Sequence, residues 1–158
     1  MYFQGTGVPK SYREGANWYK RAADHGDALA QYLVAVEYDH GRGFATSPKD
    51  AVTYYTLSAR QGNPEGEVGL CLMYFLGRGV SRDYIQAYMW CSLAVTNAPT
   101  EAERASFAPG LDQVADRMNQ GEIAEAKRRA NAWRPVDLRK SKTLCLNAAC
   151  TKVAGSIE

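Results

Sequence analysis

The sequence repeats itself at an interval of 36 residues. The run Gly41-Arg42-Gly43 recurs as Gly77-Arg78-Gly79, and one aromatic position occurs three times, as Trp18, Tyr54 and Trp90. A fixed period between about 20 and 50 residues is typical of supersecondary units stacked in an array. Such arrays generally present surfaces to other molecules rather than enclose a reaction chamber. The repeat therefore constrains the architecture strongly and leaves the identity of any partner open.

Each unit has the pattern of two helices separated by glycine. In the first unit an apolar stripe at helical spacing is followed by a glycine, where a left-handed cap would end the helix. The second helix carries a similar stripe and ends at a glycine-x-glycine turn. The residues concerned are Trp18, Tyr19, Ala22, Ala23 and Gly26, then Ala30, Val34, Ala35, Tyr38, Gly41 and Gly43. Because no segment alternates as strands do, the sequence predicts an all-α chain.

Three stretches of the first unit resemble the Sel1-like repeat family, a relative of the tetratricopeptide repeats: Ala16-Asn17-Trp18-Tyr19-Lys20-Arg21-Ala22-Ala23, Ala28-Leu29-Ala30-Gln31-Tyr32 and Tyr38-x-x-Gly41-x-Gly43. The resemblance covers about residues 7–98. It implies an α-α superhelix, a solenoid of helix pairs, that acts as a scaffold for other proteins. For bacterial members it also implies a role in envelope assembly, signalling or host interaction. The third unit is degenerate, because Ala98 stands where Gly26 and Gly62 follow the first helices.

The pattern divides the chain into four parts. Residues 1–5 look like the remainder of an engineered cleavage tag, and residues 6–98 hold about two and a half repeat units. Residues 99–134 are predicted to form a C-terminal helical cap, and residues 135–158 form a tail. Gly7-Val8 stands 36 residues before Gly43-Phe44, so we expect the parent protein to carry at least one more repeat upstream.

The predicted cap lacks the 36-residue period but has clear helix starts. Thr100 with Glu103, and Asn119 with Glu122, have the spacing of capping boxes. We expect Pro109-Gly110 to break or kink the helix that starts at Thr100. A terminal unit needs a polar outer face, and three cations suit that face, Lys127, Arg128 and Arg129.

The tail and the four cysteines leave several interpretations open. The tail, with its basic run Arg139-Lys140-Ser141-Lys142, is either a flexible or loosely docked end or a segment that docks on a groove of a neighbouring molecule. Cys71 and Cys91 are interpreted as small core residues, without the pairing inside each repeat that some secreted relatives have. A bond between Cys145 and Cys150 is weakly supported. The compartment therefore stays open, with a lean by family analogy towards the bacterial periplasm or secretion.

Charge and motifs argue against nucleic-acid, membrane and catalytic roles. The net charge of +2 gives no strong field for nucleic acid or a membrane surface. The two histidines, His25 and His40, are expected to be exposed near turns, and no His/Cys cluster has the spacing of a zinc site. No Ser-x-x-Lys arrangement occurs, although some relatives have been associated with penicillin chemistry. We therefore expect no catalytic residue, no metal and no cofactor.

The binding surface is predicted on the first helices of the units. A stripe at i, i+4, i+7 and i+11 lies on one helical face and varies between units, so it is free to specify a ligand. We expect the cations of this stripe to offer charge-assisted contacts and Met89 to offer an adaptable apolar one. This first-helix stripe comprises Arg13, Asn17, Lys20 and Asp24, then Lys49, Thr53, Thr56 and Arg60, then Ile85, Met89, Ser92 and Thr96.

The sequence as a whole predicts a non-catalytic scaffold or adaptor whose partner is a protein or peptide, with no nucleic acid and no membrane insertion. Two alternatives stay open. One is a protein that binds or hydrolyses a cell-wall fragment, which would need a polar pocket or a titratable cluster. The other is a module that self-associates through the tail or the edge of the array, which light scattering with and without residues 135–158 would detect.

Overall fold

The computed structural model describes residues 9–136, and every regular element in that range is a helix. The helices are α1 (Pro9–Asp24), α2 (Ala28–His40), α3 (Pro48–Arg60), α4 (Pro64–Leu76), α5 (Tyr84–Asn97), α6 (Glu101–Ala115) and α7 (Gln120–Ala132). None of these described helices is long and apolar enough to cross a membrane. The predicted tag remnant, the basic run of the tail, Cys145 and Cys150 lie outside the described residues.

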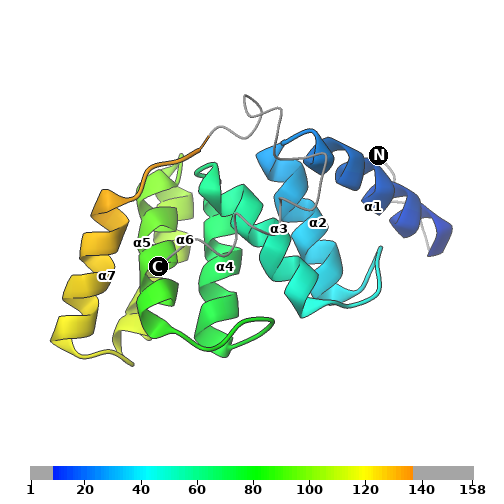
Figure 1. Ribbon diagram of the computed structural model, residues 1–158. Helices are drawn as coiled ribbons and strands as arrows, with labels where there is room; N and C mark the ends of the chain where they lie inside the picture. Colours follow the sequence, from blue (N-terminus) through cyan, green and yellow to red (C-terminus); the bar gives the residue numbers. More distant parts are fainter. Residues whose placement is uncertain (1–8, 137–158) are drawn as a thin grey trace.

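The helices form one row, from α1 at one end to α7 at the other (Figure 1). α1 pairs with α2, α3 with α4 and α5 with α6, and each pair packs on the helix that follows it. The predicted all-α solenoid of helix pairs is therefore confirmed. α6 takes the position of a second helix, although its sequence has lost the period, and α7 packs on α5 as a further first helix would.

The helix starts repeat as faithfully as the apolar residues do. Asp27 and Asn63, one period apart, each accept a hydrogen bond from the backbone N–H three residues later, at 2.7 and 2.8 Å. Ser47 and Asp83 cap α3 and α5 in the same way. These caps satisfy backbone donors that have no partner inside the helix. The units therefore begin alike because the same local interaction recurs every 36 residues.

The glycine-x-glycine turn meets two separate requirements. Gly41 and Gly77 follow α2 and α4 in the left-handed conformation, with φ of +68° and +67°, which is costly for a residue with a Cβ. The second glycine lets the loop cross closely over the first helix of its own unit. A Cβ on Gly43 would clash with the side chain of Ala16. The paired glycines therefore end one helix and hold the loop against another.

The last two helices begin at the predicted capping boxes but differ from expectation at Pro109. Both reciprocal bonds of each box are present, for Thr100 with Glu103 and for Asn119 with Glu122. Of the expected break or kink, the break does not occur, because α6 continues through Pro109 to Ala115. A proline inside a helix removes one backbone hydrogen bond, and here the packing of α6 on α5 keeps the helix in place.

One repeated aromatic position has three different environments. Trp18 is 61% exposed, Tyr54 is partly buried and Trp90 is 0% exposed. The ring of Tyr54 stacks on Tyr38 of the preceding unit, with centroids 5.8 Å apart, and Trp90 meets the edge of Trp133 at 5.8 Å. The same position is therefore a surface residue on α1 and a core residue on α5.

Two partly buried polar contacts also recur at the period. The side-chain amide of Gln61 donates to Oε1 of Gln31, and that of Asn97 donates to Oε1 of Glu67, both at 2.8 Å. The second polar atom of each acceptor side chain has a different environment. Nε2 of Gln31 donates to the carbonyl of Ala23, whereas Oε2 of Glu67 has no hydrogen-bond partner. Glu67 is fully buried, so its ionised form would leave a charge in the interior.

Replacing Trp90 with alanine should lower the free energy of unfolding by about 3–5 kcal/mol, because the change leaves a cavity in the core. The matched control is Trp18→Ala at the same repeat position, which should cost no more than about 0.5 kcal/mol because Trp18 is mostly exposed. Urea unfolding followed by circular dichroism measures both losses. Equal losses would contradict the assignment of Trp90 to the core.

The contribution of Glu67 to stability should fall as the pH rises from about 4.5 to about 8. Burial raises the pKa of Glu67 from 4.5 to about 8, against the hydrogen bond from Asn97, which lowers it. In that window the folded chain binds more protons than the unfolded chain, so a rise in pH favours unfolding. Glu67→Gln carries no charge and should exceed wild type in stability by an amount that grows through the window to a few kcal/mol.

Urea unfolding of wild type and Glu67→Gln at several pH values between the two pKa values measures this difference. Glu14→Gln is a suitable control, since Glu14 is exposed on α1, whereas the charge of Glu65 itself helps to raise the pKa of Glu67. A stability difference between wild type and Glu67→Gln that does not change with pH would show that Glu67 does not titrate in this window.

Candidate functional site

The first-helix stripe does not form one continuous surface. Its exposed members are Arg13, Asn17, Asp24, Lys49 and Thr96, and its partly buried members are Lys20, Thr53, Arg60, Ile85 and Ser92. Thr56 and Met89 are buried, with 7% and 3% of their surfaces exposed. The expectation that these two residues face a partner is therefore wrong.

Met89 is buried because α5 is covered on several sides. α4, α6 and α7 all pack on α5, and every residue from Gln86 to Cys91 is buried. The helical spacing could not show that α6 and α7, which lack the period, would pack on α5 in the third unit.

Lys20 is held by the protein's own side chains. Its Nζ donates to the hydroxyl of Tyr54 at 2.7 Å and lies 3.6 Å from Oδ1 of Asp24. Partial burial lowers the pKa of Lys20, but the bond to Tyr54 and the nearby Asp24 outweigh it, so the pKa is raised overall. Lys20 therefore stays charged and links α1 to α3. Arg13 and Lys49, one period apart, are the exposed cations of the stripe.

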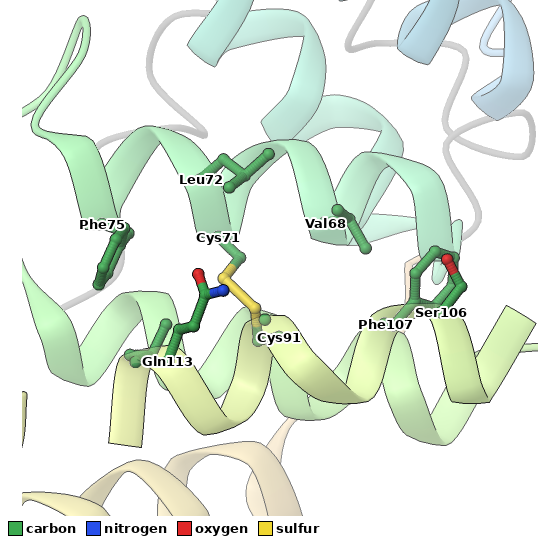
Figure 2. A pocket seen from close by; sticks show the side chains of 10 residues that line it. Val68, Cys71, Leu72, Phe75, Cys91, Ser106, Phe107 and Gln113 are labelled. Carbon is green, nitrogen blue, oxygen red and sulfur yellow. A yellow bond between two sulfur atoms is a disulfide. The ribbon is translucent and has the colours of Figure 1, made fainter. Parts of the chain in front are cut away.

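A pocket of about 230 Å³ that the repeat pattern does not predict lies between α4 and α6 (Figure 2). Most of the side chains around it are apolar. The lining consists of Val68, Cys71, Leu72 and Phe75 from α4, Cys91 from α5, and Ser106, Phe107, Gly110, Gln113 and Val114 from α6. No residue of this lining is acidic or basic. The pocket therefore suits an apolar group and offers no acid–base pair.

The sequence of α4 contains a signal for this pocket. Its apolar residues occupy the faces that meet α3 and α5 and also a further face with Val68, Leu72 and Leu76. A helix that is hydrophobic all round needs cover on every side. α6 covers only part of this further face, and Leu72 and Leu76 each remain 50% exposed.

Cys71 and Cys91 form a disulfide that joins α4 to α5, with Cα atoms 5.4 Å apart. Both residues are buried as expected of core positions, but the interpretation as separate small side chains is corrected. The bond joins the second unit to the third, and the equivalent positions one period earlier hold Ala35 and Tyr55. The repeat pattern could not reveal the bond, because this cysteine pair does not recur.

The two histidines are exposed, as predicted, and each bonds to its own helix. Nδ1 of His25 is 2.7 Å from the carbonyl of Arg21, and Nδ1 of His40 is 3.0 Å from that of Val36. Among residues 9–136, no group of three or more His, Cys, Asp or Glu side chains could hold a metal ion. The pocket between α4 and α6 is accordingly the candidate site, and its chemistry is apolar contact.

Two solved structures share this fold. A protective antigen present in uropathogenic Escherichia coli strains, described as displaying an SLR fold, matches with a TM-score of 0.78 and 22% identity. The match covers 93% of this chain and 31% of that one. A Sel1 repeat protein from Oxalobacter formigenes matches with a TM-score of 0.59 and 27% identity, over 75% of this chain and 48% of that one.

Two curated proteins are similar in sequence. The alginate biosynthesis protein AlgK of Azotobacter vinelandii is 25% identical over 141 residues, which cover 84% of this chain and 29% of that protein. Chitin synthase regulatory factor 3 of Schizosaccharomyces pombe is 37% identical over 60 residues, which cover 38% of this chain and 6% of that protein. The chain thus spans less than a third of the length of either relative.

The Sel1 repeat family matches the chain in three consecutive units, at residues 1–27, 28–63 and 64–97. The first unit includes residues 1–5, which were interpreted from the sequence as a tag remnant and precede the described structure. α6 and α7 lie beyond the matched residues. Sel1 repeats typically mediate protein–protein interaction and are generally non-catalytic. Because the matches cover more than half of the sequence and the helix pairs stack as repeats do, this chain belongs to the Sel1 repeat family.

Proposed function

We propose that this chain is a non-catalytic scaffold that binds a segment of a partner protein and takes an apolar side chain of that segment into the pocket between α4 and α6. The observation that carries the proposal is the pocket itself, with the half-exposed Leu72 in its lining and Leu76 one turn further along α4. Apolar patches on soluble proteins often mark interaction sites. Membership of the Sel1 repeat family supports the same function.

The size of the pocket favours a side chain over a free small molecule. Sites for small molecules usually enclose about 300–1,000 Å³, whereas this pocket encloses about 230 Å³. Burial of about 100 Å² of apolar surface contributes about 2.5 kcal/mol. Interfaces often depend on one or a few such anchors in well-packed pockets. A leucine or phenylalanine of the partner would contact Val68, Phe75 and Phe107.

The exposed part of the first-helix stripe is proposed as a second contact surface. Arg13 and Lys49 repeat at the 36-residue interval and both face solvent. Acidic residues spaced along a partner would pair with them. Exposed ion pairs contribute only about 0–1 kcal/mol each, so these contacts would mainly speed association and orient the partner.

A bacterial envelope or secreted setting is part of the proposal. Disulfides persist mainly in oxidising compartments such as the periplasm and the extracellular space, and one joins α4 to α5. The similarity to a bacterial alginate biosynthesis protein supports the bacterial part of this setting. In that setting the scaffold would hold a partner protein by its apolar anchor.

Leu72→Asp should weaken binding of the partner at least about 10-fold, which corresponds to about 1.4 kcal/mol, because it places a charge against an apolar anchor. The matched control is Leu29→Asp. Leu29 is a leucine of similar exposure on α2, at 53% against 50%, and it does not line the pocket. Affinity capture from extracts of the source cells identifies the partner, and titration calorimetry measures Kd for wild type and both variants.

Unchanged affinity of Leu72→Asp would refute the pocket as the binding site. An equal loss in Leu29→Asp would show that the charge acts non-specifically. Light scattering provides the remaining distinction, because a chain that captures only further copies of itself is a self-associating module rather than an adaptor.

Reversing the charge of both Arg13 and Lys49 to glutamate should slow association about 3- to 10-fold at low salt and have little effect at high salt. The control is Lys127→Glu, an exposed cation on α7 outside the stripe. Surface plasmon resonance with the captured partner measures the association rates. A reduction of the association rate that persists at high salt would argue against the stripe as a contact surface. So would an equal reduction in Lys127→Glu.

A further inference from the structure

The disulfide between Cys71 and Cys91 meets open space at the pocket between α4 and α6. Both residues are almost fully buried, yet both belong to the lining of this pocket. Figure 2 shows the two sulfurs between the ribbons of α4 and α6, with Val68 and Leu72 above them on α4. The pocket therefore offers a reagent a route to the sulfurs while the protein is folded.

Gly110 leaves the approach to one of the two sulfurs clear. A Cβ at this position would lie 3.8 Å from Sγ of Cys91, an ordinary van der Waals distance, and no closer neighbour would obstruct it. A methyl group at this position would already touch Sγ of Cys91, so a side chain at Gly110 would occupy the space over that sulfur. The absence of a side chain at Gly110 keeps part of the pocket open directly over the disulfide.

Two polar side chains of α6 flank the approach. Figure 2 shows the amide of Gln113 beside the sulfurs, and Ser106 further along the same helix. A hydroxyl and an amide can donate hydrogen bonds to an anion, and no residue of the lining is acidic. The pocket therefore offers donors for a thiolate or a carboxylate and no negative charge to repel it.

We propose that the Cys71–Cys91 disulfide is a thiol-exchange site that low-molecular-weight thiols reach through the pocket between α4 and α6. The thiolate of the small molecule attacks Sγ of Cys91, a mixed disulfide forms there, and Cys71 leaves as a thiolate that takes up a proton. A second small thiol then attacks the sulfur that the first small thiol contributed to the mixed disulfide. Cys91 leaves as a thiolate and takes up a proton. Two thiols are oxidised to one small-molecule disulfide, and the protein disulfide is reduced to two thiols.

Size gives the site its selectivity. A pocket of about 230 Å³ admits part of a small thiol but not the catalytic surface of a protein reductant. Loss of the bond would remove the covalent link between α4 and α5, and both helices contribute to the lining of the pocket. Exchange would therefore change the shape of the pocket, because that shape depends on how α4 is held against α5.

Reduced glutathione is the probe, and release of the Cys71 and Cys91 thiols in the folded protein is measured by alkylation and mass spectrometry of the peptides that carry them, apart from those with Cys145 and Cys150. The rate should rise in proportion to glutathione concentration and change little at urea concentrations below the unfolding transition. Gly110→Leu should slow it at least about 10-fold, because the side chain fills the space over Cys91. Ala105→Leu, an exposed position on α6 outside the lining, should react like wild type.

A second variant tests the sulfur that is attacked. In Cys71→Ala the remaining Cys91 thiol should form a mixed disulfide with oxidised glutathione, and adding Gly110→Leu should block it. Equal rates for wild type and Gly110→Leu would overturn the proposal. So would a rate that reaches a plateau with glutathione and rises with urea in parallel with global unfolding, since exchange would then require the unfolded chain.

Discussion

The packing of neighbouring helices around α5 is the interaction on which the rest of the structure depends. α4, α6 and α7 all contact this helix, and Trp90 at its centre is fully buried. Cys91 ties α5 to α4 covalently, and Asn97 ties it to α4 again through the buried Glu67. A single repeat unit cannot bury its own apolar face and gains stability only from its neighbours. α5 provides this contact in three directions at once.

The proposed binding site follows from that arrangement. α6 packs on α5 as a second helix does, but it leaves a gap against α4 that becomes the apolar pocket. The same gap brings the disulfide to the surface of a cavity, because Gly110 places no side chain over Cys91. Partner binding at Leu72 and thiol exchange at Cys91 would thus use one opening. Both depend on how α4 is held against α5.

Equivalent positions of the repeat do not have equivalent roles. Trp18 and Trp90 share a place in the sequence pattern, but only Trp90 is covered by further helices. Gln31 and Glu67 receive equivalent hydrogen bonds from Gln61 and Asn97, but burial raises the pKa of Glu67, whose second oxygen has no hydrogen-bond partner. Local chemistry recurs with the period, whereas burial depends on position in the array.

The sequence by itself determined the helices, their caps, the glycine turns and the stacked architecture. These features depend on residues close together in the chain, as the cap at Asp27 and the left-handed Gly41 illustrate. Only the tertiary structure decided that Met89 is buried, that Cys71 pairs with Cys91 and that a pocket opens beside Leu72. Each of these depends on how α5 and α6 lie against α4. No periodic pattern encodes that placement, because the sequence of α6 does not repeat.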